Sequence, residues 1–325
     1  MATISTQNRP GRAIGLRLMA IFLFMVMAAL IKTASDTVPP GQAVFFRSLF
    51  AFPVILIWLW QQHDLSTGLI PRNLMGHVWR GVFGTSAMAL TFGGLGLLPL
   101  PEVTAIGYAT PLFTVLFAAF FLGERVRLFR LSAVGLGLIG VMIVLLPRLQ
   151  TTDDPLSAAA TIGALMVLAA AVLRALVQIH LRQLVKTEHT AAIVFYFSLT
   201  ATCLSLLTLP LGMATGWSGL QWVNPGWTIA GLMITAGLIG GVAQILVTSS
   251  FRFGAASMLA PFDYASMIFA SLIGWVVFGE LPTSTIVIGA ALVTAGGVLI
   301  IWRERQLGLD RNKSKANLPS HEAPS

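Results

Sequence analysis

The chain has 325 residues, of which 56% are hydrophobic and only 10% are charged. Because soluble globular domains carry about 25% charged residues, this composition and a mean hydropathy of +0.84 exclude an ordinary soluble protein and indicate an integral membrane protein. The net charge of +8 would suit a nucleic-acid partner, but the positions of the cations along the chain favour a different explanation.

Ten apolar stretches follow one another along the chain. Each has about 18 to 23 residues, enough for an α-helix to cross the hydrocarbon core of a bilayer. We expect these crossings at residues 14–34, 42–61, 77–98, 103–122, 128–147, 159–181, 190–211, 226–248, 255–278 and 283–302. The loops between them are too short for a separate soluble domain. The predicted fold is therefore all-α and integral to the membrane, with ten transmembrane helices.

The chain also contains an internal duplication. Glu124 and Glu280 each close an apolar segment with the dipeptide Gly-Glu, and they lie 156 residues apart. The same offset aligns three further pairs: Tyr108 with Tyr264, Gly84 with Gly240, and Gly140 with Gly296. Because each copy contains an odd number of crossings, the second copy enters the membrane in the opposite orientation. The sequence therefore predicts two inverted five-helix repeats.

Four segments follow from this pattern. Residues 1–13 form an N-terminal tail, residues 14–147 the first repeat and residues 159–302 the second repeat. Residues 303–325 form a polar C-terminal tail, which we expect to be disordered because it is charged and contains proline and serine.

The cations are distributed unevenly between the two sides of the membrane. If the N-terminus is cytoplasmic, sixteen of the twenty lysines and arginines fall on the cytoplasmic side and only Arg148 falls in an outside loop. The other three, Lys32, Arg47 and Arg174, lie within crossings. This is the distribution that the positive-inside rule gives for a protein with both termini in the cytoplasm. The basic excess therefore reflects topology, and we expect no nucleic-acid partner.

Two other interpretations of sequence patterns conflict with the repeat. Residues 9–35 resemble a secretory signal peptide, since cations precede an apolar stretch that ends in Thr33-Ala34-Ser35. Cleavage there would leave nine crossings and destroy the duplication. The run from Gly135 to Gly140 matches a dinucleotide-binding pattern, but it lies within an apolar crossing rather than between a strand and a helix.

The polar residues within the crossings are candidates for function, because an ionisable group at the centre of a bilayer costs about 2.5–3.5 kcal/mol on insertion scales. Lys32 ends the first crossing and either snorkels to the interface or takes part in gating. Arg47 lies deeper in the second crossing, where an internal salt bridge and a ligand contact are both open. Arg174 and Gln178 lie in the sixth crossing and Gln244 in the eighth. For Arg174, a structural role near the cytoplasmic interface is the alternative.

Asp263 is the strongest candidate. At 1.5 Å per residue it lies about 12 Å from the cytoplasmic start of the ninth crossing, which is too deep for a short side chain to snorkel. Pro261 removes a backbone donor beside it. Asp263 would bind a cationic or hydrogen-bond-donating solute, or carry a coupling proton if burial raises its pKa. The structural alternative is a salt bridge with Arg174 or Arg47.

These residues resemble those of a known family. The resemblance is carried by Lys32 and Arg47, by the run from Tyr108 through Pro111 to Gly123-Glu124, and by its echo in Phe278-Gly279-Glu280. Over residues 14–302 the chain is similar to the drug/metabolite transporter superfamily, in its ten-helix branch with duplicated EamA domains. The second copy departs from the pattern, with Phe197 at the position of Arg47 and Met267 at that of Pro111.

The resemblance implies a cavity between the repeats and ATP-independent, alternating-access transport of a small organic solute. It implies a secondary transporter without cofactor, metal or catalytic residues, in a bacterial inner membrane, as a monomer or homodimer. We assign substrate-binding or coupling roles to Asp263, Tyr264, Tyr108, Arg47, Gln244, Gln178 and Arg174. We assign gating or structural roles to Lys32, Pro111, Glu124, Pro261 and Glu280.

The stretch from Ala260 to Met267, followed by Phe278 to Pro282, is similar to bacterial riboflavin and S-adenosylmethionine uptake proteins. It implies uptake of a heterocyclic metabolite such as riboflavin. The alternatives are S-adenosylmethionine or export of an amino acid or other metabolite. An intramembrane enzyme would need a matched acid and base, and only Asp263 with the distant His180 is available. A channel would need a continuous hydrophilic stripe, which the sparse polar residues do not supply.

Overall fold

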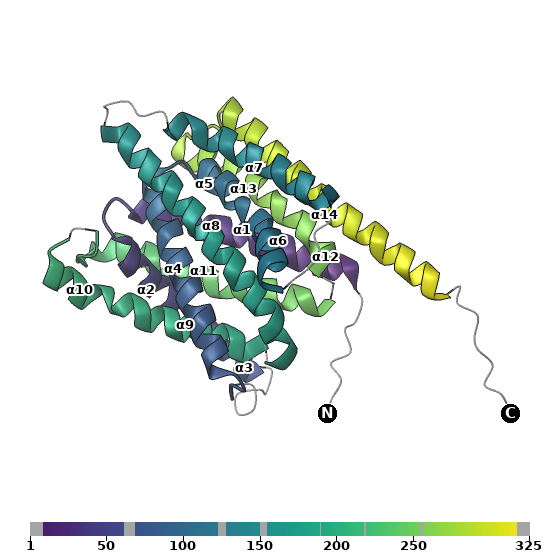
Figure 1. Ribbon diagram of the computed structural model, residues 1–325. Helices are drawn as coiled ribbons and strands as arrows, with labels where there is room; N and C mark the ends of the chain where they lie inside the picture. The colour runs from purple at the N-terminus through teal and green to yellow at the C-terminus, as the bar shows by residue number, and fades with distance from the viewer. Residues whose placement is uncertain are drawn as a thin grey trace.

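The computed structural model describes residues 9–61, 69–122, 128–149, 155–188, 190–217, 219–253 and 256–316, and within these ranges all regular structure is helical. The helices pack side by side in one bundle, with the last helix projecting beyond it towards the C-terminus (Figure 1).

The first repeat contains five crossings, two of them interrupted. They are α1 (Pro10–Ala34), α2 (Pro40–Leu49) continued by α3 (Ala51–Gln61), α4 (Leu74–Leu97), α5 (Leu100–Gly107) continued by α6 (Ala109–Leu122), and α7 (Leu128–Leu149). Proline stands in the first turn of α1, α2 and α5, where its fixed φ suits a helix start and its missing N–H leaves no bond unmade.

The second repeat follows the same plan. Its crossings are α8 (Pro155–Thr187), α9 (Thr190–Leu206) continued by α10 (Thr208–Thr215), α11 (Gly226–Phe253), α12 (Ala256–Leu259) continued by the 3₁₀ helix η1 (Ala260–Tyr264) and α13 (Ala265–Phe278), and α14 (Ser284–Ala316).

The ten-helix membrane fold predicted from the sequence is confirmed. In the described residues, seven segments are long and apolar enough to span a membrane, and two shorter apolar helices lie at Leu131–Pro147 and Ser284–Leu299. The 24 residues of α4 complete the ten crossings. The predicted ends agree with the helices to within a few residues, except at the C-terminus.

The prediction of a disordered tail from residue 303 is wrong for its first part. The tenth helix continues to Ala316, and Figure 1 shows this extension of α14 running past the end of the bundle. Its sequence, Arg-Glu-Arg-Gln-Leu-Gly-Leu-Asp-Arg, is rich in residues of high helix propensity and has no proline before Pro319. The polar composition of this segment disfavours its insertion into the membrane, but it does not end the helix.

The fourth and ninth crossings are interrupted at equivalent positions. The fourth breaks at Tyr108, between α5 and α6, and the ninth tightens into the 3₁₀ helix that ends at Tyr264. Proline contributes to both breaks from different places, since Pro111 cannot bond the carbonyl of Gly107 and Pro261 opens η1. The duplication therefore preserves the position of the break although the prolines are not aligned.

The fifth and tenth crossings, α7 and α14, approach to backbone contact. A Cβ added to Gly140 would lie 2.6 Å from the carbonyl oxygen of Gly289, and one added to Gly289 would lie 2.6 Å from that of Gly140. One added to Gly296 would lie 2.6 Å from the Ala133 carbonyl oxygen. Because lipid offers no hydrophobic force between helices, such close packing of small residues is a principal source of their association.

We therefore predict that Gly289→Val destabilises the bundle by about 1–3 kcal/mol, since the added side chain forces α7 and α14 apart. Gly135→Val is the matched control, because it lies on α7 with nothing within 4 Å of its added Cβ. Thermal unfolding of the purified variants in nanodiscs would measure the difference. Equal midpoints for the two variants would contradict the contact.

Candidate functional site

The two repeat-related tyrosines meet at the breaks in their helices. The rings of Tyr108 and Tyr264 lie edge to face, with centroids 5.1 Å apart. The Tyr108 hydroxyl lies 2.9 Å from the Tyr264 carbonyl oxygen and 2.8 Å from Ser266 Oγ. It also accepts a hydrogen bond of 2.8 Å from the Met267 backbone N–H. One side chain of the first repeat thus binds the backbone of the second repeat where that backbone leaves regular helix.

Asp263 forms an ion pair with Arg17 of α1. Both hydrogen bonds of the guanidinium fork are present, from Nε to Oδ1 at 2.6 Å and from Nη2 to Oδ2 at 2.7 Å. The partners expected from the sequence for a structural salt bridge, Arg174 and Arg47, are therefore incorrect. Arg17 was counted with the cytoplasmic cations, but it lies almost two turns into α1 and its side chain is only 14% exposed. The Asp263 side chain is 43% exposed.

A second ion pair lies at the end of the bundle where α1 finishes. Lys32 Nζ is 3.1 Å from Glu280 Oε1, and it donates hydrogen bonds to the carbonyl oxygens of Leu95 and Leu98 at the end of α4. Glu280 Oε2 accepts from the backbone N–H of Leu100 at 2.9 Å. This pair joins the ends of the first, third, fourth and ninth crossings that meet there.

The two ion pairs connect the same two crossings at different heights. Arg17 and Lys32 are about 22 Å apart along α1 at 1.5 Å per residue, and their partners are Asp263 in η1, inside the ninth crossing, and Glu280 just beyond the end of α13. The sequence singled out Lys32, Asp263 and Glu280 without indicating how they pair.

Three arginines are enclosed within the bundle without a carboxylate partner among the described residues. Arg47 and Arg80 are 5% and 6% exposed. The Nε atoms of both, and Nη2 of Arg174, have no hydrogen-bond partner. The Arg174 guanidinium lies beside the break in the fourth crossing, where a Cβ on Gly107 would be 3.7 Å from its Nη2. Each such charge at depth costs about 2.5–3.5 kcal/mol on insertion scales, and such groups are kept for function more often than for stability.

Arg47 and Arg80 flank a single aromatic ring. Their guanidinium carbons lie 5.8 Å and 4.6 Å from the ring centroid of Phe197. Arg80 donates one hydrogen bond, from Nη1 to the Ile193 carbonyl oxygen at 3.0 Å. Cation–π contacts of this kind offset about 0.5–2 kcal/mol each, which does not neutralise either charge.

The arginine arrangement follows the repeat. Arg47 and Phe197 occupy the eighth positions of α2 and α9, which begin at Pro40 and Thr190. Their glycine neighbours are repeat-related as well. A Cβ on Gly84 would lie 2.7 Å from the Phe197 ring, and one on Gly240 would lie 3.4 Å from Arg47 Nε. The two halves therefore make the same helix contact with opposite chemistry, cationic in one and aromatic in the other.

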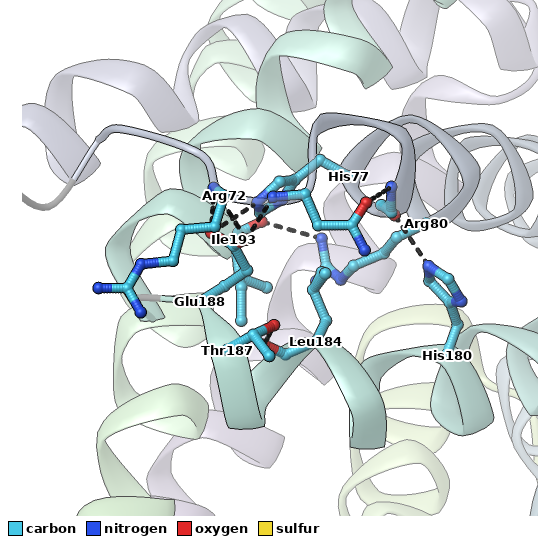
Figure 2. Close-up of polar contacts among 10 residues, drawn as sticks. Arg72, His77, Arg80, His180, Leu184, Thr187, Glu188 and Ile193 are labelled. Carbon is cyan, nitrogen blue, oxygen red and sulfur yellow. Dashed lines mark hydrogen bonds and ion pairs between the residues drawn. The ribbon is translucent and has the colours of Figure 1, made fainter.

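A cluster of titratable groups joins the start of α4 to the turn between α8 and α9 (Figure 2). The Glu188 carboxylate accepts hydrogen bonds from the backbone N–H groups of Arg72 and Asn73, with the shortest at 2.6 Å. His77 Nε2 lies 3.4 Å from Glu188 Oε2. His180 Nε2 lies 3.1 Å from the Gly76 carbonyl oxygen. Its position on α8, directed at α4, indicates a structural role.

Burial raises the pKa of the Glu188 carboxyl, but the hydrogen bonds from Arg72, His77 and Asn73 outweigh burial and hold the pKa below its ordinary value. The carboxylate is therefore ionised at neutral pH, and it compensates the unpaired N–H groups and the positive end of α4.

The remaining predicted site residues lie apart from the ion pairs. Gln178 Oε1 accepts from Thr114 Oγ1 at 3.1 Å, which links α8 to α6. Gln244 is half-buried on α11 and donates no side-chain hydrogen bond to the described residues. Glu124 lies outside the described residues.

Sequence reasoning missed three polar residues with clear placement. Arg80 was counted as a cytoplasmic cation, although it stands more than one turn inside α4. Glu188 was assigned to a loop. Glu102 is 1% exposed in the first turn of α5. A count of residues from the start of α4 would have identified Arg80, which lies six residues, or about 9 Å, inside that helix.

A cavity of about 270 Å³ lies near the outer ends of α1, α2 and α4, with Ile31, Ser35, Val38, Phe92 and Met166 in its mostly apolar lining. It does not include the tyrosine pair or the arginines. The predicted cavity around Tyr108 and Tyr264 therefore stays a prediction.

An all-helical membrane bundle with two inverted halves, broken helices at its centre and ion pairs across the halves defines a transporter of the inverted-repeat class. The chain belongs to the EamA-like transporter family, whose model matches residues 11–146 and 161–302, and hence to the drug/metabolite transporter superfamily.

Curated relatives carry several names. The chain is 32% identical to the pseudopaline exporter CntI of Pseudomonas aeruginosa over 88% of this chain and 92% of the relative. It is 28% identical to a riboflavin transporter of Rhizobium johnstonii over 82% of each. It is 24% identical to an S-adenosylmethionine uptake transporter of Rickettsia prowazekii over 84% of this chain and 87% of that one. These names point to transporters rather than enzymes.

The fold has a counterpart among solved structures. One crystal structure superposes with a TM-score of 0.61 at 22% identity, covering 91% of this chain and 99% of the other. This likeness concerns the fold alone.

We predict that Glu188→Gln lowers stability by about 1–3 kcal/mol, because the backbone N–H groups of Arg72 and Asn73 lose a charged acceptor. The sign of the pH dependence follows from the lowered pKa. The contribution of Glu188 is present above the unfolded carboxyl pKa and is lost as pH falls through the lower folded value. Acid unfolding followed by helical circular dichroism should therefore be shallower in the variant. An unchanged acid transition would contradict this role.

We also predict that Lys32→Gln opens the outer end of the bundle. The reporter is Thr104→Cys in a Cys203→Ser background, which places a thiol one turn inside the contact between Leu100 and Glu280. When Lys32→Gln is added, labelling of this thiol by a membrane-impermeant maleimide should rise several-fold. Asp36→Asn is the control, because its exposed carboxylate lies one turn beyond Lys32 on the same side. Labelling that rises equally in both would show that the ion pair does not close this end.

Proposed function

We propose that the protein is a secondary carrier that moves a small organic metabolite between its two repeats by alternating access, without ATP. The proposal rests on the two ion pairs between the first and ninth crossings, Arg17–Asp263 and Lys32–Glu280, which lie towards opposite ends of α1. An inverted repeat supplies two related conformations in which the opposite ends open. A charged contact at each end supplies a reversible closure.

Each ion pair can break and form again, because its charged groups have other surroundings to turn to when the pair is broken. When Lys32 leaves Glu280, it keeps the carbonyl oxygens of Leu95 and Leu98 within reach. When Arg17 leaves Asp263, the Asp263 side chain is already 43% exposed at the protein surface. Partly exposed ion pairs contribute only about 0–1 kcal/mol. Neither contact is therefore strong enough to hold the carrier in one state.

The cation distribution supports a cytoplasmic location for both termini in a bacterial inner membrane. The Lys32–Glu280 pair then closes the outer end, and the Arg17–Asp263 pair closes the cytoplasmic end.

The proposal has two further parts, which are the identity of the solute and the direction of its transport across the membrane. Uptake of a heterocycle such as riboflavin is one candidate, supported by the riboflavin transporter among the relatives. Export of a metabolite is the other. We favour export, because the relative with 32% identity is an exporter and because enclosed arginines suit a solute unlike the sulfonium cation S-adenosylmethionine.

An intramembrane enzyme has less support. The predicted acid, Asp263, is bound through both oxygens by Arg17, and His180 is directed at the Gly76 carbonyl. The two side chains therefore engage different partners on different helices.

A counterflow assay in proteoliposomes tests the carrier directly. Vesicles loaded with one unlabelled solute from a panel of heterocycles, amino acids and polycarboxylates should accumulate that labelled solute only when the protein is present. Labelled solute that only equilibrates, with no transient accumulation above its external concentration, would indicate a channel. No accumulation with any solute would contradict the carrier.

In the same assay we predict that Asp263→Asn lowers net flux several-fold, because the cytoplasmic end no longer closes around Arg17. The charge-swapped pair Arg17→Asp with Asp263→Arg should recover part of the flux. Asp36→Asn again serves as the control for loss of an acid. Normal flux through Asp263→Asn at normal abundance would contradict both a gating and a coupling role.

A further inference from the structure

We propose that Arg47 and Arg80 form a binding site for carboxylate groups of the solute, so that the carrier takes a small organic anion. This inference rests on the proposed carrier function and adds the chemical class of its solute. The site is made by α2, α4 and α9, with Phe197 between the two guanidinium groups.

The first argument is charge balance. Arg47 and Arg80 are nine-tenths buried or more, and each is close enough to the other for their like charges to interact. No carboxylate of the described ranges forms an ion pair with either one, since the ion pairs found there use Arg17, Lys32 and His77. Two enclosed like charges without an acid are unfavourable for folding alone, and an anionic ligand would balance them.

The second argument is the supply of donors. Among the described residues, Nε of Arg47 and Nε of Arg80 have no acceptor, and the one side-chain hydrogen bond of Arg80 found there runs from Nη1 to the Ile193 carbonyl. A guanidinium group presents its donors in a planar fork that matches a carboxylate through two parallel hydrogen bonds. The Ile193 contact and the Phe197 ring hold the Arg80 fork in place, as preorganised recognition requires.

The third argument is the close packing around the site that glycine permits. Gly240 of α11 lies against Arg47, and Gly84 of α4 lies against Phe197, so larger side chains at either position would press on the arginine–phenylalanine group. These glycines are repeat-related, yet the repeat places an arginine in one half and a phenylalanine in the other. The cationic character is therefore confined to one half, which gives an anion a defined side and orientation.

Binding of carboxylate probes to the full-length protein in nanodiscs tests the inference. The probes are citrate and glutarate, with glutaramide as a neutral analogue of glutarate and inorganic phosphate as a second anion. We expect citrate and glutarate to raise the unfolding temperature in a saturable manner, and glutaramide to leave it unchanged. A response to phosphate without one to the carboxylates, or no response to either carboxylate, would overturn the proposal.

Matched variants locate the response. Arg47→Gln and Arg80→Gln should each weaken the apparent affinity for citrate at least tenfold. Arg72→Gln is the control, because the Arg72 side chain is exposed and only its backbone N–H binds Glu188. Equal affinities in Arg47→Gln, Arg80→Gln and the unaltered protein would place the anion elsewhere and overturn the proposal.

A second readout separates binding from structure. Without ligand, Arg47→Gln should be at least as stable as the unaltered protein, because the substitution removes an unpaired buried charge. A marked loss of stability without ligand, with citrate affinity retained, would show a structural arginine.

Counterflow distinguishes the two proposals. Unaltered exchange by Arg47→Gln and Arg80→Gln would leave the carrier standing and overturn the anion site. Carboxylate binding by a protein that exchanges no solute would overturn the carrier and leave the anion site standing.

Discussion

Inside a bilayer every backbone N–H and carbonyl group has to find its partner within the protein, and this constraint explains the centre of the structure. The crossings are helices because helices satisfy their own backbone. Where the ninth crossing leaves regular helix, another partner is needed, and the Tyr108 hydroxyl supplies it by accepting from Met267 and lying beside the Tyr264 carbonyl. The breaks that make a transporter flexible thus depend on a side chain from the opposite repeat.

The same constraint explains how much the sequence predicted. Ten crossings, the inverted duplication and the meeting of Tyr108 with Tyr264 follow from apolar length and from one repeated offset, which are local or symmetric properties. The partner of Asp263 was predicted wrongly because pairing depends on the rotation and height of α1 against the ninth crossing. No pattern in a single sequence specifies that register.

The missed residues have a related physical cause. Arg80 was assigned to the cytoplasm because cations near a crossing usually belong to the interface, and a long side chain there normally snorkels. In the structure it is directed inward to Phe197 and the Ile193 carbonyl. The C-terminal tail was assigned to disorder on composition alone, whereas α14 continues to Ala316 because its charged residues still favour a helix.

Imperfect symmetry is what allows the two halves to divide their roles. Equivalent helix contacts carry an arginine at position 47 and a phenylalanine at position 197, while Gly84 and Gly240 preserve the close approach in both. In the proposed carrier, the duplicated backbone would relate the two conformations, and the unequal side chains would determine what is bound between them. In the proposed carrier the ion pairs divide in a similar way. The Lys32–Glu280 pair would remain supported by helix-end carbonyls when it opens, and the Arg17–Asp263 pair would release a carboxylate whose side chain is already 43% exposed. Opening either end would then exchange one set of polar partners for another rather than leave a charge unsatisfied in hydrocarbon.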